Sequence, residues 1–380
     1  MNFWEKLPKP FFALAPMADV TDTAFRRVIA KYSKFTRNDG SRGGLDVMWT
    51  EFVSADGLCS AGREVLKRDL EYTEAERPIV AQLFSSHPEK MREAAKLCAE
   101  MGFDGIDINM GCPDRSIEKQ GAGAAMIKTP EIAEQIIQAA KDGIEDAVKN
   151  SDGKLMSIPV SVKTRVGYNS VQIDEWIPFL LKQNISALTV HARTRKEMSA
   201  VPAHWDYIKK VVEIRNEMGI KTKILGNGDV VDIDDGRRKC AQTGCDGIMI
   251  GRAIFGNPWL FANLHGKEND SKQVSIKSKP SIINRFIRSL KVGKSKKEAK
   301  KYWLQTVSAV PVEERLHVML EHTKLFEELL GDIKSFAVMK KHYKAYVNGF
   351  DGAKELRMKL MDSNSYEEIE AHVNEFLNQR

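Results

Sequence analysis

Short runs of β-branched and apolar residues recur along most of the chain, and each is followed by a polar turn and an amphipathic stretch. This alternation is typical of parallel βαβ units, because successive parallel strands need a helical crossover between them. Eight runs fit the pattern, at 11–18, 47–52, 79–84, 105–111, 159–166, 187–193, 223–230 and 247–252. Eight such units within about 250 residues have the dimensions of a (β/α)₈ barrel. The sequence therefore predicts an α/β fold of the TIM-barrel type.

The strand pattern stops after Phe261, and helical periodicity dominates the rest of the chain. One apolar stripe of helical spacing contains Leu316, Met319, Thr323, Phe326 and Leu330. A single core stops growing near roughly 250 residues, so a chain of 380 residues implies more than one domain. We expect a barrel domain at 1–265, a polar Lys/Ser-rich linker at 266–280 and an all-α helical bundle at 281–380.

Local signals mark several helix starts and one insertion. Ser or Thr followed three residues later by Glu is typical of a capping box. This motif occurs at Ser86–Glu89, Ser295–Glu298 and Ser365–Glu368, while Thr129–Pro130 places a capping hydroxyl before a proline. The polar, glycine-rich stretch from Ser33 to Leu45 precedes the second strand, so it predicts a surface loop on the amino-terminal face of the barrel.

Positive charge is concentrated in one segment. The formal net charge is +6, yet residues 266–301 alone carry twelve Lys or Arg and three Asp or Glu, so the rest of the chain is slightly acidic. Such a concentration favours a phosphate-backbone partner, although a solvated linker would have the same composition.

The sequence lacks a stretch of about eighteen apolar residues, and its beginning lacks the layout of a secretory signal. We therefore expect a cytoplasmic monomer without a membrane anchor. Five scattered cysteines indicate reduced thiols rather than a disulfide framework. Cys240 and Cys245 form only an isolated pair, so no metal site is predicted.

Active sites of such barrels are built from the carboxyl ends of the strands, and these ends are rich in polar and glycine residues. They carry Pro16, Met17 and Ala18; Gln82; Asn109 and Cys112; Lys163 and Arg165; His191 and Arg193; Asn227, Gly228 and Asp229; Gly251 and Arg252. The glycines after the last two strands would let backbone amides approach a phosphate, and Arg252 would add a charged contact. The alternative is that these glycines only allow the backbone to turn at the strand ends and bind nothing.

Lys163 lies within a run whose alternate residues are apolar, so its ammonium group needs a partner. A structural ion pair is one interpretation. If a flavin occupies the mouth of the barrel, Lys163 would instead stabilise negative charge near N1 and O2 of the reduced ring. Gln82 and His191 would then hydrogen-bond the ring or its side chain.

Cys112 is the most distinctive thiol, because Gly111 and Pro113 flank it and a glycine-bearing loop, 120–123, follows. At a reference pKa of about 8.5 a thiol is mostly protonated at neutral pH, so it can donate a proton without special activation. The other cysteines, Cys59, Cys98, Cys240 and Cys245, are expected to pack in helices or turns.

Together the strand ends resemble one family, the tRNA-dihydrouridine synthases. The resemblance rests on eight motifs in order, which cover the barrel: APMA (15–18) with Thr21 and Asp22, AQLF (81–84), DINMGCP (107–113), QGAGA (120–124), VKTR (162–165), HARTR (191–195), GNGD (226–229), and GR (251–252) with GNPW (256–259). The segments 341–343 and 352–357 also resemble the helical RNA-binding domain of that family.

The resemblance implies an FMN-dependent reduction of the C5=C6 bond of uridine in tRNA, with NADPH as the electron source. Hydride would pass from the flavin to C6, and Cys112 would protonate C5 from the opposite side. Asn109, Arg165 and Arg193 would contact the substrate. The remaining strand-end residues named above would hold FMN, and the helical domain would help to bind the RNA.

The chain departs from the family pattern at a few places. Ala192 replaces the usual glycine, and the loop 196–203 differs, which puts the substrate pocket in question. Two other functions remain possible from the sequence: a dihydroorotate-dehydrogenase-like reductase of a free pyrimidine, and a non-catalytic RNA-binding factor on the same barrel.

Overall fold

The computed structural model describes residues 2–36, 40, 42–262 and 310–380. All eight predicted runs form strands of one parallel sheet, so the predicted barrel is confirmed. The strands are β1 (Phe11–Leu14), β4 (Met48–Ser54), β5 (Ile79–Phe84), β6 (Gly105–Met110), β7 (Val160–Arg165), β8 (Ala187–His191), β9 (Lys223–Asn227) and β10 (Gly247–Ile250). Consecutive strands from β4 to β10 pair in order, and β10 pairs with β1. A parallel bridge between Ala13 and Val47 then joins β1 to the start of β4, which closes the barrel.

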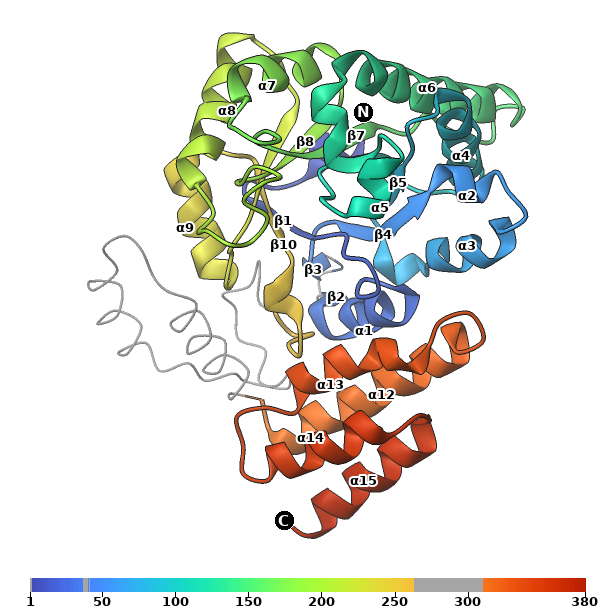
Figure 1. Ribbon diagram of the computed structural model, residues 1–380, viewed down its shortest axis with the longest axis vertical. Helices are drawn as coiled ribbons and strands as arrows, with labels where there is room; N and C mark the ends of the chain where they lie inside the picture. The colour runs from blue at the N-terminus through green and yellow to red at the C-terminus, as the bar shows by residue number, and fades with distance from the viewer. Residues whose placement is uncertain (1, 37–39, 41, 263–309) are drawn as a thin grey trace. The chain divides into compact units, whose positions relative to one another are not determined.

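Helices connect the strands and surround them on the outside of the barrel (Figure 1). They are α1 (Thr23–Ser33), α2 (Ala55–Leu58), α3 (Arg63–Leu70), α4 (Pro88–Glu100), α5 (Arg115–Lys119), α6 (Pro130–Lys149), α7 (Ile173–Lys182), α8 (Trp205–Glu217) and α9 (Ile233–Thr243), with short 3₁₀ turns η1 (Phe3–Lys6), η2 (Glu74–Glu76), η3 (Gly123–Lys128) and η4 (Arg252–Ile254). Among the described residues, no helix is both long and apolar enough to cross a membrane.

Two of the predicted helix starts need correction in their details. At α4 the N-cap residue is His87, and the hydroxyl of Ser86 donates to the carbonyl of Gln120, so the predicted capping box does not form. At α6 the proline does occupy the first turn, but the hydroxyl of Thr129 makes no capping bond. In both places proline alone sets the start, because its fixed φ suits the first helical position.

The lower part of the barrel interior is apolar. One buried cluster draws residues from six strands and from Trp4 of η1: Trp4, Phe11, Ala13, Ala15, Val47, Trp49, Val80, Ala187, Leu225 and Met249. Because side chains alternate along a strand, residues two positions further along lie on the same inner face. On β5 and β9 these are Gln82 and Asn227, so the inner face becomes polar toward the carboxyl ends of the strands.

The stretch predicted as a surface loop between residues 33 and 45 contains a short hairpin instead. β2 (Lys34–Thr36) pairs antiparallel with β3 (Arg42–Gly44). At Gly44 φ is +87°, and an added Cβ would lie 1.6 Å from the carbonyl oxygen of Ser33. Only glycine fits this close approach of two backbones. Gly44 therefore allows the two strands to pair.

The chain divides into two compact units, 1–30 with 45–251, and 31–44 with 252–380. The second unit contains α12 (Val312–Leu330), η5 (Phe336–Met339), α13 (Lys340–Tyr346), α14 (Ala353–Asp362) and α15 (Tyr366–Asn378). The stripe predicted on 316–330 is buried along α12, and the hydroxyl of Ser365 caps α15 by accepting from the amide of Glu368. The predicted linker at 266–280, the basic segment 266–301 and the Ser295–Glu298 motif lie outside the described residues.

The core of the second unit contains two histidines, which predict an acid-sensitive fold. His322 and His342 are fully buried, and their rings lie 4.6 Å apart in an edge-to-face arrangement. Burial lowers the pKa of His322 to about 3 and that of His342 well below its usual value. Below about pH 6.5 the unfolded chain therefore binds more protons than the folded one. Each histidine then lowers the free energy of unfolding by up to about 1.4 kcal/mol for each unit by which the pH falls.

We expect the free energy of unfolding of this unit to fall as the pH drops from 7.5 to 5, as measured by urea unfolding. His322→Phe should flatten that dependence, whereas the same change at the partly exposed His372 is the control. An unchanged slope in His322→Phe would contradict the assignment.

Candidate active site

The predicted site residues of the first unit gather at the carboxyl ends of adjacent strands. In the sheet register Asn109 lies opposite Lys163, Arg165 opposite His191, and His191 opposite Asn227. Partners in a parallel register point to the same side of the sheet, so these side chains form a polar layer two residues deep above the apolar core, with Lys163 one level below Arg165. The structure thus brings the ends of β6 to β9 together on the inside of the barrel.

Lys163 is held in this layer by β7. Desolvation inside the barrel and the neighbouring charge of Arg165 together lower the pKa of its ammonium group to about 8, although Asp107 and Cys112 oppose the shift. At neutral pH the ammonium group is therefore still mostly charged, but it gives up its proton more readily than that of an ordinary lysine. Such a cation suits the stabilisation of negative charge in a dry site.

Three amide and carboxyl side chains link β5 to β6 beside Lys163. The Nδ2 of Asn109 donates to Oε1 of Gln82 at 3.2 Å, and Nε2 of Gln82 donates to Oδ2 of Asp107 at 2.6 Å. Asn109 Oδ1 accepts from the backbone amides of Gly111 at 3.1 Å and Cys112 at 2.9 Å. Asn109 thus fixes the backbone that carries the thiol.

Cys112 is half-buried just beyond the end of β6. It packs against a small apolar cluster of Phe84, Ile117 and Ala122. Gly123 has φ of +62°, and an added Cβ would lie 2.8 Å from the carbonyl oxygen of Cys112, so glycine allows the 121–123 segment to pack on this loop. Burial raises the pKa of the thiol, and the charges of Lys163 and Arg165 only partly oppose this. The group therefore stays protonated at neutral pH and can act as an acid.

The two predicted substrate arginines are bonded to the protein itself. Arg165 Nε donates to the carbonyl of Gly111 at 2.7 Å, and Nη1 reaches the carbonyl of Thr194 at 3.2 Å. Arg193, which is 2% exposed, contacts Nε2 of His191 at 3.1 Å and forms an ion pair with Asp229. These contacts hold the loops after β6, β8 and β9 in place, so a positioning role suits both arginines better than direct contact with a substrate.

The residues predicted to hold a phosphate lie at the ends of β9 and β10. These strands pair, and Asn227 Nδ2 donates to the carbonyl of Met249 at 2.9 Å. Gly228 has φ of +125°, and an added Cβ would lie 2.9 Å from Ala203, so this turn requires glycine. Gly251 follows β10 at the neighbouring strand end, and Arg252 comes next in the chain, at the start of the second unit.

Asp229 differs from the other predicted cofactor residues. Its Oδ2 accepts from the backbone amide of Ala203 at 3.0 Å as well as from Arg193. A carboxylate would repel a phosphate, so Asp229 fits the role of anchoring the loop after β8. Pro16, Met17 and Ala18 form the turn after β1, where the amide of Met17 donates to the hydroxyl of Thr21 at 2.9 Å.

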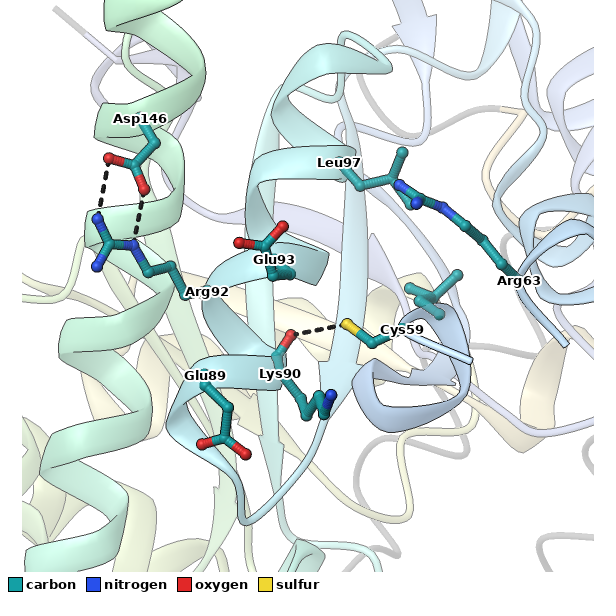
Figure 2. Close-up of a pocket in the computed structure, with 9 residues that line it drawn as sticks. Cys59, Arg63, Glu89, Lys90, Arg92, Glu93, Leu97 and Asp146 are labelled. Atoms are coloured by element: carbon teal, nitrogen blue, oxygen red, sulfur yellow. Dashed lines mark hydrogen bonds and ion pairs between the residues drawn. The ribbon is translucent and has the colours of Figure 1, made fainter. Parts of the chain in front are cut away.

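A separate pocket of about 540 Å³ lies among helices of the outer layer (Figure 2). It is lined by Leu58, Cys59, Arg63, Glu89, Lys90, Arg92, Glu93, Leu97 and Asp146. Arg92 pairs with Asp146 at 2.7 Å, and the thiol of Cys59 donates to the carbonyl of Lys90 at 3.6 Å. No sequence motif points to this pocket, so it is a weaker candidate than the strand ends. Within the described ranges, no cluster of three or more metal-ligating side chains occurs.

Sequence reasoning missed the residues that support the site from behind. Asp107 is fully buried beneath Asn109, and Ser161 Oγ donates to it at 2.6 Å. Glu118 on α5 pairs with Arg195, which ties the helix after Cys112 to the loop after β8. Asp107 shares the alternation of Asn109 along one strand, so that periodicity could have placed it on the inner face. No local pattern indicates the Glu118–Arg195 pair, whose members lie 77 positions apart.

Comparison with known proteins identifies a single family. The family model described as "Dihydrouridine synthase (Dus)" matches residues 13–307. A "Probable tRNA-dihydrouridine synthase 2" of Bacillus subtilis (strain 168) is 36% identical over 377 residues, which cover 99% of this chain and 96% of that protein. A "Probable tRNA-dihydrouridine synthase" of Staphylococcus aureus (strain COL) is 36% identical over 380 residues, covering 99% and 95%.

Proposed function

The chain belongs to the dihydrouridine synthase family, and from this premise we propose that it reduces the C5=C6 bond of uridine in tRNA to dihydrouridine. FMN would be the cofactor, NADPH the electron source and Cys112 the proton donor. The observation that carries the proposal is that Asn109 lies opposite Lys163 in the sheet and also holds the backbone amide of Cys112, so an acidic thiol and an ammonium group belong to neighbouring strand ends.

The residues present fit a flavin at this place. Lys163 would supply a cation for the electron-rich edge of the ring, and Gln82 and His191 would supply hydrogen-bonding groups. Gly228 and Gly251 follow two adjacent strand ends, where phosphate is commonly bound in these barrels. When bound, FMN would supply a hydride, that is, two electrons and one proton, to C6 of the uracil.

The protein itself supplies the second hydrogen. The S–H bond of Cys112 breaks as a C–H bond forms at C5, and the resulting thiolate regains its proton from solvent. Asn109 holds the Cys112 backbone during this step, and Arg165 fixes the neighbouring carbonyl of Gly111. The thiol needs no activation as a nucleophile, because only its acid form takes part.

A base stacked in folded RNA cannot enter a barrel mouth, so the uridine has to be flipped out at a cost of a few kcal/mol. Contacts to the RNA backbone would offset this cost. The basic segment 266–301 is the richest source of cations in the chain, and neutralised phosphates make binding steeply dependent on salt.

Replacing Lys296 and Lys297 with Glu is therefore expected to weaken tRNA binding and to lower its salt slope by about one per lost phosphate contact, with FMN retained. Filter binding across a salt series measures both quantities. Lys221→Glu is the control, because this exposed residue lies at the amino end of β9, opposite the active face. Unchanged affinity in the Lys296/Lys297 variant would remove the segment from the RNA interface.

The function is tested by mapping dihydrouridine in tRNA from cells with and without the gene. The proposal predicts that particular uridines gain two hydrogens only when the gene is present. Turnover of free uracil by the purified protein without tRNA would instead favour a pyrimidine reductase, and a colourless protein that binds no flavin would favour a non-catalytic RNA-binding factor.

A further inference from the structure

Asp107 stands at one end of a hydrogen-bond chain that ends at the backbone of the reactive cysteine. We call Asp107, Gln82 and Asn109 the amide chain. Asp107 is fully buried at the centre of β6, and its carboxylate accepts from Nε2 of Gln82 and from Oγ of Ser161, each at 2.6 Å. Neither contact requires the flavin or the RNA.

The two ends of the amide chain have opposite and fixed polarity. An ionised carboxylate can only accept hydrogen bonds, whereas the backbone amides of Gly111 and Cys112 can only donate. The amide of Gln82 must therefore turn its NH₂ group toward Asp107, and that of Asn109 must turn its oxygen toward the backbone. Each side-chain amide could flip on its own, but the two ends together permit one arrangement.

We propose that Asp107 is a positioning residue, whose ionised carboxylate fixes both amides of the amide chain and thereby holds Cys112 where it can protonate the uracil. This inference rests on the proposed function. Asp107 touches no reacting atom, and it acts only through Gln82 and Asn109. Loss of its charge would let Gln82 flip, so Asn109 Nδ2 would lose its acceptor on Gln82 and the side chain that holds the Cys112 backbone would be fixed at one end only.

Protonation of Asp107 would have the same consequence. Burial raises the pKa of this carboxyl to about 6 even though the hydrogen bonds from Ser161 and Gln82 and the charge of Lys163 on β7 oppose the shift. Below that pH the group becomes able to donate, and the polarity of the amide chain is no longer defined. The rate of uridine reduction should therefore fall on the acid side with an apparent pKa near 6.

The test is the pH profile of a single turnover between pH 5 and 7.5, with enzyme whose flavin has been reduced beforehand and tRNA that lacks dihydrouridine. Wild type should show the acid limb near pH 6. Asp107→Asn should be at least tenfold slower at pH 7, retain flavin, and lack the acid limb. Asp235→Asn, which alters another buried carboxyl on α9, should keep it.

A milder variant covers the case in which Asp107→Asn does not fold. Ser161→Ala removes one hydrogen bond to the ionised carboxylate, so the acid limb should move to higher pH. An acid limb that persists in Asp107→Asn, or that stays in place in Ser161→Ala, would overturn the inference. Wild type that makes no dihydrouridine would instead refute the proposed function.

Discussion

Replacing Cys112 with alanine is expected to slow dihydrouridine formation by roughly 10²- to 10⁴-fold, the usual contribution of a positioned general acid. Burial keeps the thiol protonated at neutral pH, so the variant loses the proton donor without disturbing a charge. Binding of FMN and of tRNA should be retained, because the thiol makes no contact that either requires. Nucleoside mass spectrometry of tRNA after timed incubation measures the rate.

Cys59→Ala is the matched control. Cys59 also has a raised thiol pKa caused by burial, but it lies at the end of α2, in the outer pocket. It should leave the rate unchanged. If Cys112→Ala worked within about threefold of wild type, well short of general-acid magnitudes, the proton would come from another group.

Replacing Lys163 with methionine is expected to lower the rate at which NADPH reduces the bound flavin by roughly 10²- to 10³-fold, as removal of a preorganised charge commonly does. The pKa of Lys163 is lowered to about 8, so the cation is lost as the pH rises through that value. In wild type the rate should therefore fall above pH 8. The thiol of Cys112 titrates later, because its pKa is raised.

Lys163→Arg separates charge from shape. A guanidinium stays charged at every accessible pH, so this variant should keep part of the rate and lose the alkaline limb near pH 8. Bleaching of the flavin absorbance by NADPH, followed from pH 6 to 10, measures both variants. An alkaline limb that stays at pH 8 in Lys163→Arg would assign it to a different group.

The barrel could be predicted from the sequence because strand alternation and helical periodicity are local signals. In the run 159–166 and in the stripe on α12, the apolar pattern of a short segment already indicates which residues are buried. The hairpin at 34–44 could not, since Gly44 serves a backbone contact with Ser33 that no local pattern indicates. The capping bond expected at Ser86 was lost to a tertiary partner, the carbonyl of Gln120.

The sequence could indicate which side chains lie at the strand ends, but not which hydrogen bonds and ion pairs they form. Strand ends suffice to bring Asn109, Lys163 and His191 into one layer, because parallel strands end at the same rim. The partners of Arg165 and Arg193 depend on how the loops after β6, β8 and β9 fold back. The same holds for Asp107, whose contacts with Gln82 and Ser161 span 25 and 54 positions.

We propose that the mouth of this barrel brings a flavin and a uridine of tRNA together. Anaerobic reoxidation of the reduced, enzyme-bound flavin after addition of tRNA that lacks dihydrouridine tests this directly. We expect the flavin absorbance to return and one dihydrouridine to form per flavin reoxidised. Flavin that stays reduced with tRNA, yet is reoxidised by a free pyrimidine, would contradict it.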